Sequence, residues 1–555
     1  MDFVSTFAEN LSGAVWGWPD RFPLMVAILL VTGLVTTVSL RFIQLRKLKH
    51  SLDVIRGKYD DPAHKGDLSH FQALTTALSA TVGIGNIAGV ATAIHYGGPG
   101  ALFWMWVTAV FGMALKYAEC TLSMRFRTIL PDGSASGGPM YYIEKGLGKK
   151  WKPLAVFFAV CAVTSSFGSG NSIQAFTVAD QMRSDLGIPT WITGLVLASL
   201  VASVIIGGIK RIGQVTSKLV PYMAAIYITG GLLVLIMNIG QIPAVLGGIF
   251  KSAFQPAAQF GGFAGGSFIF MLTWGVKRGL FSNESGQGSA PIAHAAAKTD
   301  EPVREGVVAM MGPMIDTLII CTITGLVILS TGVWHERHAD RLELNDQSDL
   351  TVVVQEAHVL IDGDVDDSQR YDGAVRIEQG EPVDAAFVRN HSLVVDPVLT
   401  DAEGRPWNGT LVVKDGDLDT EASSGLWIQG DMALNGSPLT AAAFQRGLSP
   451  LGDFGRYIIT VAVLLFGLST AISWSYYGDR AIVYLAGPRW VTPYKVMFCV
   501  MHFLGAIFSL EVVWNFGDSA LGLMALPNLI GLILLLRVTG RMTDEYFAKK
   551  HTPLR

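Results

Sequence analysis

The stretch Ser79-Ala-Thr-Val-Gly-Ile-Gly-Asn86 places two glycines inside an otherwise apolar segment, residues 70–94. A second glycine-rich stretch, Trp274-Gly-Val-Lys-Arg-Gly-Leu-Phe-Ser-Asn283, continues as Glu284-Ser-Gly-Gln-Gly288 and overlaps the apolar segment 262–282. A bilayer tolerates irregular backbone only where protein or a water-filled cavity receives the freed amides and carbonyls. The paired interruptions therefore predict two broken membrane helices around a buried binding site, as in transporters.

The composition supports a membrane protein. The 555 residues are 50% hydrophobic, and many apolar runs reach the roughly 20 residues that span hydrocarbon. We expect an all-α polytopic protein with about eleven spans, at residues 21–43, 70–94, 98–124, 152–182, 190–208, 218–239, 262–282, 304–332, 455–484, 490–511 and 516–537. Its four cysteines fall within these spans, where they are expected to be small apolar core residues rather than a disulfide framework.

The distribution of lysine and arginine predicts the orientation. The first connection is basic, with Arg41, Arg46, Lys47, Lys49, Arg56, Lys58 and Lys65. It should be cytoplasmic by the positive-inside rule, and the later connections alternate consistently with that assignment. We therefore expect the N-terminus outside and the C-terminus inside a plasma membrane, the inner membrane of a bacterium. No basic residue precedes the first apolar run, which favours a retained helix over a cleaved signal peptide.

One long hydrophilic segment interrupts the pattern of apolar spans. Residues 334–450 hold 22 acidic and eight basic side chains, against a net charge of −4 for the whole chain. It contains runs in which apolar and polar residues alternate, separated by turns of glycine, aspartate and proline. Examples are Leu350-Thr-Val-Val-Val-Gln355, His391-Ser-Leu-Val-Val-Asp396 and Thr410-Leu-Val-Val-Lys414. We expect a small β-rich domain outside the membrane, or alternatively an acidic loop that only aids solubility.

Motifs throughout the apolar part resemble one family, the alanine or glycine:cation symporters. They are residues 77–94, Gly97-Gly-Pro-Gly-Ala-Leu-Phe-Trp-Met-Trp106, Lys116-Tyr-Ala-Glu119, Gly137-Gly-Pro-Met-Tyr-Tyr-Ile143, residues 275–291 and Ser475-Tyr-Tyr-Gly478. Only the acidic insert departs from the pattern. The resemblance implies a leucine-transporter-like fold of ten core helices in two inverted five-helix repeats, preceded by one extra helix.

The same resemblance implies a division of the chain and an activity. The expected parts are an accessory helix (1–44), a cytoplasmic basic linker (45–69), core helices one to seven (70–332), the extracytoplasmic insert (333–450), core helices eight to ten (451–540) and a cytoplasmic tail (541–555). The expected activity is sodium-driven import of alanine or glycine by alternating access. Na⁺ is then the co-transported ion, and the oligomeric state stays open.

Sodium ligands are expected where the first core helix unwinds. Carbonyls from about Ser79 to Val82 are hard oxygen ligands, and by resemblance Ser469 and Thr470 of the eighth core helix complete the shell. The alternative is that these hydroxyls bond within their own helix. A second ion position is implied near Asn86, the Thr81 backbone and Thr273, although Asn86 could instead bond across a helix interface.

A zwitterionic substrate needs partners for its carboxylate and its ammonium. The unwound amides of Gly83, Ile84, Gly85 and Asn86 suit the carboxylate. Phe167, Asn171 and Gln174 share one face if the third core helix is regular, so they could contact substrate or merely pack. Phe270, Trp274 and Gly275 are expected to wall the pocket from the sixth core helix, with packing as the alternative.

Charged residues beside the second break suggest a gate. Lys277, Arg278 and Glu284 are expected to form a salt bridge near the cytoplasmic end, in preference to direct substrate contact. Proton coupling is a variant, because Glu119, Asp180 and Asp316 are carboxylates within or beside the predicted spans. A nontransporting sensor with the insert as signalling domain is a second alternative. An enzyme is not expected, since no metal or nucleophile motif organises the insert's histidines.

Overall fold

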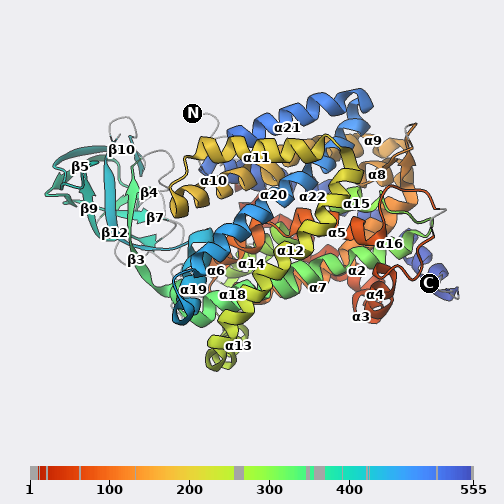
Figure 1. Cartoon of the computed structure of the whole chain (residues 1–555), viewed down its shortest axis with the longest axis horizontal. Coiled ribbons are helices and arrows are strands. Elements are labelled where there is room, and N and C mark those ends of the chain that lie inside the picture. Colours follow the sequence, from red (N-terminus) through yellow and green to blue (C-terminus); the bar gives the residue numbers. More distant parts are fainter. Residues whose placement is uncertain are drawn as a thin grey trace.

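The computed structural model shows an elongated helical bundle with a strand-rich insert at one end (Figure 1). It describes residues 11, 13–19, 23–61, 64–131, 133–255, 268–344, 350–354, 369–389, 392–414, 416–419, 423, 425–507, 510–549 and 551. The predicted spans 21–43 and 262–282, the insert and the tail are therefore described only in part. The C-terminus lies at the end of the bundle away from the insert, which we call the opposite end.

The first predicted broken helix is confirmed. Helix α5 (His70–Thr81) begins at Ser69, whose hydroxyl accepts a hydrogen bond from the Gln72 amide in a capping box. It ends at Val82, and the chain continues through a short 3₁₀ turn, η2 (Ile84–Asn86), into α6 (Ala88–Gly97). The two halves are bent by 63°. The break therefore lies within the glycine-rich stretch that predicted it.

The second break lies further along the chain than Trp274–Asn283. Helix α14 (Phe268–Asn283) is continuous through that stretch, and the irregular segment is 284–289, before α15 (Ala290–His294). Gly286 and Gly288 have φ of +81° and +85°, which glycine adopts freely. Gly275 is helical because it packs against α7, where an added Cβ would lie 2.7 Å from the Ala101 carbonyl oxygen.

The remaining helices form the body of the bundle. They are α2 (Leu24–Ser39), α3 (Ile43–Arg46), α4 (Leu48–Ile55), α7 (Gly100–Phe126), α8 (Pro139–Leu147), α9 (Lys152–Phe167), the π-helical η4 (Gly168–Ser172), α10 (Ile173–Leu186), α11 (Thr190–Ile205), α12 (Gly208–Met237), α13 (Ile242–Ser252), α16 (Pro302–Ala309), α17 (Met311–Pro313), the π-helical η7 (Met314–Cys321), α18 (Thr322–Thr331), α19 (Gly436–Leu448), α20 (Gly455–Ala486), α21 (Val491–Gly505) and α22 (Leu510–Ala548).

Within the described residues, six helices are long and apolar enough to cross a membrane, or seven if the bent pair is one span. Two shorter apolar helices, α2 and α11, have 16 residues each. Large aliphatic and aromatic side chains on several of the helices face outward, including Tyr222 of α12 at 75% and Val496 of α21 at 61% exposure. The predicted class of helical membrane protein agrees with this pattern, whereas the count of eleven spans stays a prediction.

The insert contains antiparallel strands around its own apolar core. Three sheets have the orders β11-β10-β5-β6, β3-β12-β9 and β4-β7-β8. The strands are β3 (Arg337–Glu343), β4 (Leu350–Val354), β5 (Gly373–Glu378), β6 (Glu381–Pro382), β7 (Ala385–Arg389), β8 (Ser392–Leu393), β9 (Val395–Thr400), β10 (Gly409–Lys414), β11 (Asp417–Leu418) and β12 (Trp427–Ala433). A short hairpin of β1 (Thr128–Ile129) and β2 (Ala135–Ser136) lies outside the insert.

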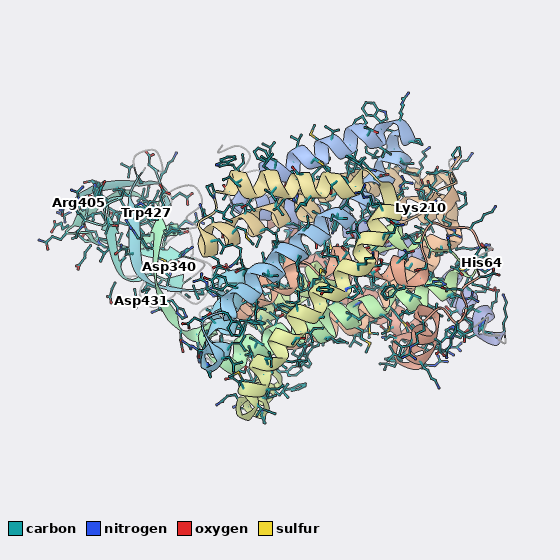
Figure 2. All side chains as sticks on the ribbon, in the orientation of Figure 1. His64, Lys210, Asp340, Arg405, Trp427 and Asp431 are labelled. Atoms are coloured by element: carbon teal, nitrogen blue, oxygen red, sulfur yellow. The ribbon has the colours of Figure 1, made fainter. Side chains whose placement is uncertain are left out.

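The insert is joined to the bundle by a short connection. Figure 2 places Asp340, Arg405, Trp427 and Asp431 on the insert, with His64 and Lys210 toward the opposite end. Helix α19 follows β12 after two residues. Its Thr440 hydroxyl donates a 3.1 Å hydrogen bond to the Ile87 carbonyl at the first break, and its N-cap Asn435 donates to the Tyr96 hydroxyl over 3.4 Å.

Candidate functional site

A small cavity lies where the two breaks meet. Its volume is about 20 Å³, close to what one water molecule occupies. The lining residues come from α5, the first break, η4, α10, the end of α14, the second break, α20 and α22: Ala80, Thr81, Gly83, Gly85, Ser169, Gln174, Phe281, Glu284, Thr470, Trp474 and Leu521. The predicted central site is therefore built mainly from residues distant in the sequence.

The unwound backbone at the first break has two roles. The Gly83 amide donates to the Asn86 side-chain oxygen over 2.9 Å, so this amide shapes the turn rather than facing a ligand. An added Cβ on Gly83 would lie 2.5 Å from Thr470 Oγ1, and one on Gly85 would lie 3.1 Å from the Phe281 ring. Glycine is therefore needed here for close approach between the break and its neighbours.

The predicted hydroxyl pair meets the end of α5. The Ser79 carbonyl accepts hydrogen bonds from Thr470 Oγ1 at 3.1 Å and from Ser469 Oγ at 3.4 Å. Ser79 Oγ in turn donates to the Ser469 carbonyl over 2.8 Å, and all three residues are buried. Several oxygen atoms thus converge between α5 and α20, the donor type that hard cations prefer. Val82 ends α5 beside them.

A buried carboxylate organises the surroundings of Asn86. Asn86 Nδ2 donates to Asp316 Oδ1 over 2.5 Å, and the Ser282 and Thr317 hydroxyls donate to Asp316 Oδ2 over 2.7 Å each. Asp316 is fully buried in the π-helical segment η7, an irregularity that often marks functional sites. The hydrogen bonds to this carboxylate come from neutral amide and hydroxyl groups, and the buried Lys116 of α7 is a cationic group that acts on it electrostatically.

Thr273, predicted to join Asn86, is not part of this cluster. It lies nine residues before Ser282 on the continuous helix α14, about 13 Å along the axis. Ser282 and Thr317 were not predicted, and Asp316 was considered only as a proton relay. The sequence indicated a role for Asp316, because burying a carboxylate in the apolar span 304–332 costs free energy and such residues are usually functional.

The third core helix contributes Gln174 but not its predicted partners. Gln174 Nε2 donates to the Ser169 carbonyl over 3.0 Å. Its Oε1 is buried, has no hydrogen-bond partner among the described residues, and lies 3.5 Å from the Cβ position of Gly83. Gln174 therefore presents an unused acceptor to the cavity.

Asn171 and Phe167 turn toward α21 instead. Asn171 Nδ2 donates to the Phe498 carbonyl over 2.8 Å, and Phe167 contacts the rings of Tyr494 and Phe498. The prediction assumed regular α-helical spacing, but the π-helical segment η4 separates Phe167 from Gln174. A π-helical segment adds residues to a turn and rotates the following side chains, which explains the failure.

The predicted wall from α14 is also displaced. Trp274 packs against Tyr96 of α6 with ring centroids 4.3 Å apart and ring planes tilted by 34°, and it contacts Phe270. Gly275 packs against α7. These residues lie along α14 away from the second break, so Phe281 and Trp474 wall the cavity in their place. Trp474 was detectable as the residue one helical turn beyond Thr470 on α20.

The charged residues of the predicted gate separate into two groups. Lys277 and Arg278 lie over the Trp274 ring at 5.2 and 5.1 Å, and the Arg278 stem reaches within 3.8 Å of the Gly89 Cβ position on α6. Glu284 lines the cavity and accepts hydrogen bonds from Trp474 Nε1 at 2.8 Å and Ser289 Oγ at 2.5 Å. The cationic pair thus lies on the α6 side, not beside α15.

Comparisons with known proteins indicate one family. The model of the sodium:alanine symporter family matches residues 1–361 and 421–554. The chain is 41% identical over 548 residues to the sodium/alanine symporter AgcS of Methanococcus maripaludis, covering 98% of each chain. It is 31% identical over 532 residues to the amino-acid carrier protein AlsT of Bacillus subtilis, covering 95% of this chain and 90% of that one.

Among solved structures, the crystal structure of MhsT in complex with L-phenylalanine aligns with a TM-score of 0.49 and 10% identity. It covers 88% of this chain and 99% of that one.

Proposed function

Because the chain belongs to the sodium:alanine symporter family, we propose that it couples inward sodium movement to import of a small neutral amino acid by alternating access. The family makes it a multi-pass membrane protein that moves amino acids. The observation that supports the specific proposal is the cavity between two helix breaks, together with two oxygen-rich clusters that include Ser79 of α5 and Asn86 of the first break. Eleven spans in a five-plus-five repeat, with the insert outside a bacterial plasma membrane, belong to the same proposal.

The first sodium site is proposed between α5 and α20. Its ligands would be the Ser79 carbonyl and the hydroxyls of Ser469 and Thr470, which already lie within 3.4 Å of that carbonyl. The Val82 carbonyl at the end of α5 would complete it. A cation here would bridge the two helices, because its ligands come from both. Binding would thereby favour the state in which the cavity is closed.

A second cation position is proposed at Asp316. Asn86, Ser282 and Thr317 surround its carboxylate, and a monovalent cation would balance the buried charge. The same carboxylate favours one alternative, proton coupling, because protonation would neutralise it equally well. Sodium and proton gradients applied separately distinguish these cases.

The substrate is proposed to lie with its ammonium toward Glu284 and Gln174 and its carboxylate toward the amides of Ile84 and Gly85. Glu284 supplies a carboxyl group at the cavity wall, and Gln174 Oε1 supplies a neutral acceptor. The cavity holds about one water molecule as it stands, so substrate binding requires it to widen, and a small side chain between Phe281 and Trp474 requires less widening than a large one. Alanine, glycine or serine fit this description better than a larger amino acid.

The deciding experiment is uptake of labelled alanine into proteoliposomes under an inward sodium, potassium or proton gradient. We expect accumulation with sodium only, competed by glycine and serine more strongly than by phenylalanine. A Gly247→Ala variant is the matched control, since nothing lies within 4 Å of that Cβ position. Saturable binding without accumulation under any gradient would reject symport and favour the sensor alternative.

A further inference from the structure

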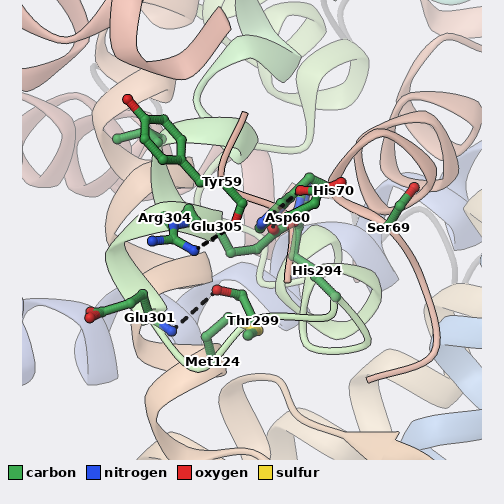
Figure 3. A network of polar contacts seen from close by, with 12 residues as sticks. Tyr59, Asp60, Ser69, His70, Met124, His294, Thr299, Glu301, Arg304 and Glu305 are labelled. Atoms are coloured by element: carbon green, nitrogen blue, oxygen red, sulfur yellow. Dashed lines mark hydrogen bonds and ion pairs between the residues drawn. The ribbon is translucent and has the colours of Figure 1, made fainter. Parts of the chain in front are cut away.

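Figure 3 shows a network of acidic and imidazole groups that joins α5, α15 and α16, and Figure 1 places α15 and α16 toward the opposite end of the bundle. Glu305 of α16 is fully buried, and its Oε1 lies 2.5 Å from His294 Nδ1 of α15. Its other oxygen, Oε2, is bonded to His70 Nδ1 of α5. Both histidines are 1% exposed. One carboxylate thus holds together the two short helices that flank the breaks on this side.

The far side of His70 faces a second carboxylate. His70 Nε2 lies 3.8 Å from Asp60 Oδ1, and both atoms are buried without a hydrogen-bond partner in the described part of the chain. If Nδ1 donates its proton to Glu305, a neutral ring presents a lone pair at Nε2 to the Asp60 carboxylate, which is repulsive. A proton on Nε2 converts this into an attraction and places an imidazolium between two anions.

Other charged groups around His70 have partners of their own. The two arginines bond to backbone carbonyls: Arg304 to that of Tyr59, and Arg127 to those of Lys65, Ala295, Ala297 and Thr299. The carboxylates have other partners: Asp67 accepts from the Ala135 amide, Asp300 lies near His64 and Arg127, Asp53 pairs with Lys58, Glu301 with Lys549, and Asp479 with Arg480 and Lys495. The Cys120 thiol is buried on α7. Asp60 and Glu305 are therefore the carboxylates that face the two ring nitrogens of His70.

We propose that Asp60, His70, Glu305 and His294 form a proton-binding site that latches α5 and α15 to α16 and closes the opposite end of the transporter. This proposal rests on alternating access, because opening that end must move the half-helix α5 away from both α16 and α12, and α15 away from α16. With His70 protonated, one positive charge lies between the Asp60 and Glu305 carboxylates and offsets half of their negative charge. Loss of the proton leaves buried anions that destabilise the closed arrangement. By reciprocity, opening releases the proton, so alkaline conditions on this side favour opening.

Accessibility of one cysteine tests the latch without requiring substrate. Thr76 of α5 is fully buried and its hydroxyl is 3.1 Å from the Thr216 hydroxyl of α12, so a Thr76→Cys side chain can react only if α5 leaves α12. Alkylation by a water-soluble maleimide is measured in proteoliposomes between about pH 6 and 8, where histidine titrates. Each rate is divided by that of free cysteine at the same pH, and the parent chain gives the background.

The corrected rate is expected to rise with pH, by at most about tenfold per pH unit for one linked proton. In His70→Gln the profile should become flat. His64→Gln is the matched control, because His64 also lies near two carboxylates, Asp61 and Asp300, but does not join the half-helices; its profile should follow the parent. Asp60→Asn, at a residue with a 34% exposed side chain, should shift the rise toward acid, and keeps the test decisive if His70→Gln does not fold.

Three results would overturn the latch. They are a profile in His70→Gln that matches the parent, an unshifted profile in Asp60→Asn, and a Thr76→Cys side chain that is unreactive or reacts without pH dependence. Sodium-driven uptake of alanine by the same preparation separates this outcome from failure of the symport proposal.

Discussion

Replacing Gly83 by alanine tests whether the close contact between the first break and α20 controls binding. The new Cβ would lie 2.5 Å from Thr470 Oγ1 and 3.5 Å from Gln174 Oε1. The backbone itself accepts alanine, because φ is −132° at this position. Thr470 must therefore give way by about half an ångström, and its hydroxyl is held 3.1 Å from the Ser79 carbonyl.

The size of the effect follows from the cost of overpacking. Inserting a methyl group into a packed site costs about 1–3 kcal/mol. If the strain falls mainly on the occupied state, affinity decreases about 5- to 100-fold, since about 1.4 kcal/mol corresponds to a factor of ten. We expect Gly83→Ala to raise the half-saturating concentrations of both sodium and alanine. The displaced Thr470 hydroxyl belongs to the proposed sodium site, and the cavity that the new methyl group fills is the proposed alanine site.

The assay is initial-rate uptake in proteoliposomes, with sodium varied at fixed alanine and the reverse. Thermal unfolding in detergent is measured beside it, and Gly247→Ala serves as the control for a glycine replacement without a clash. Wild-type half-saturation for both ligands in a folded Gly83→Ala protein would refute the proposed placement of the sites.

Three further predictions use other groups. The double variant Ser469→Ala, Thr470→Ala should remain folded and lose sodium dependence of uptake, and normal sodium-driven uptake would remove these hydroxyls from the mechanism. Gln174→Leu should raise KM for alanine about 10- to 100-fold, since a hydrogen bond to a charged group contributes about 1.5–3 kcal/mol, with a smaller change for sodium. Burial, helped by the charges of His551 and Lys47, lowers the pKa of His50 to about 4, so the folded protein favours the neutral ring. Stability from this effect is complete above pH 6.5 and is lost as pH falls toward 4, and His50→Gln should show a smaller fall in Tm over that range than the parent.

The sequence predicted the first break because Gly83 and Gly85 flank a real change of backbone direction. It misplaced the second because glycine serves two purposes in membrane helices. Gly275 and Gly279 allow α14 to approach α7 closely, where added Cβ atoms would lie 2.7 Å from Ala101 and 3.1 Å from Thr108. Gly286 and Gly288 supply positive φ. Pattern alone does not separate close packing from unwinding.

The site was predicted in part for a similar reason. The Ser469 and Thr470 pair depends on local sequence and a family resemblance. Both hydroxyls lie within 3.4 Å of the Ser79 carbonyl, and Ser469 Oγ also bonds within its own helix to the Phe466 carbonyl over 3.0 Å, so their role as sodium ligands stays a prediction. Phe167 and Asn171 depended on uninterrupted helical spacing, which a π-helical turn removes. The cluster around Asp316 combines α14, η7 and the first break, a tertiary arrangement that no local pattern encodes.

The hydrogen bond from Thr440 to the Ile87 carbonyl has a practical consequence for reagents. Two residues separate helix α19 from the last strand of the insert, and α19 carries the Thr440 side of the contact with the unwound backbone. An antibody fragment that binds the sheets would therefore restrict movement of the first break without occupying the cavity. A fluorescent protein or conformational reporter inserted between two strands would be connected through α19 to the same peptide unit. The insert is therefore a suitable site for reagents that inhibit transport or report movement of the first break.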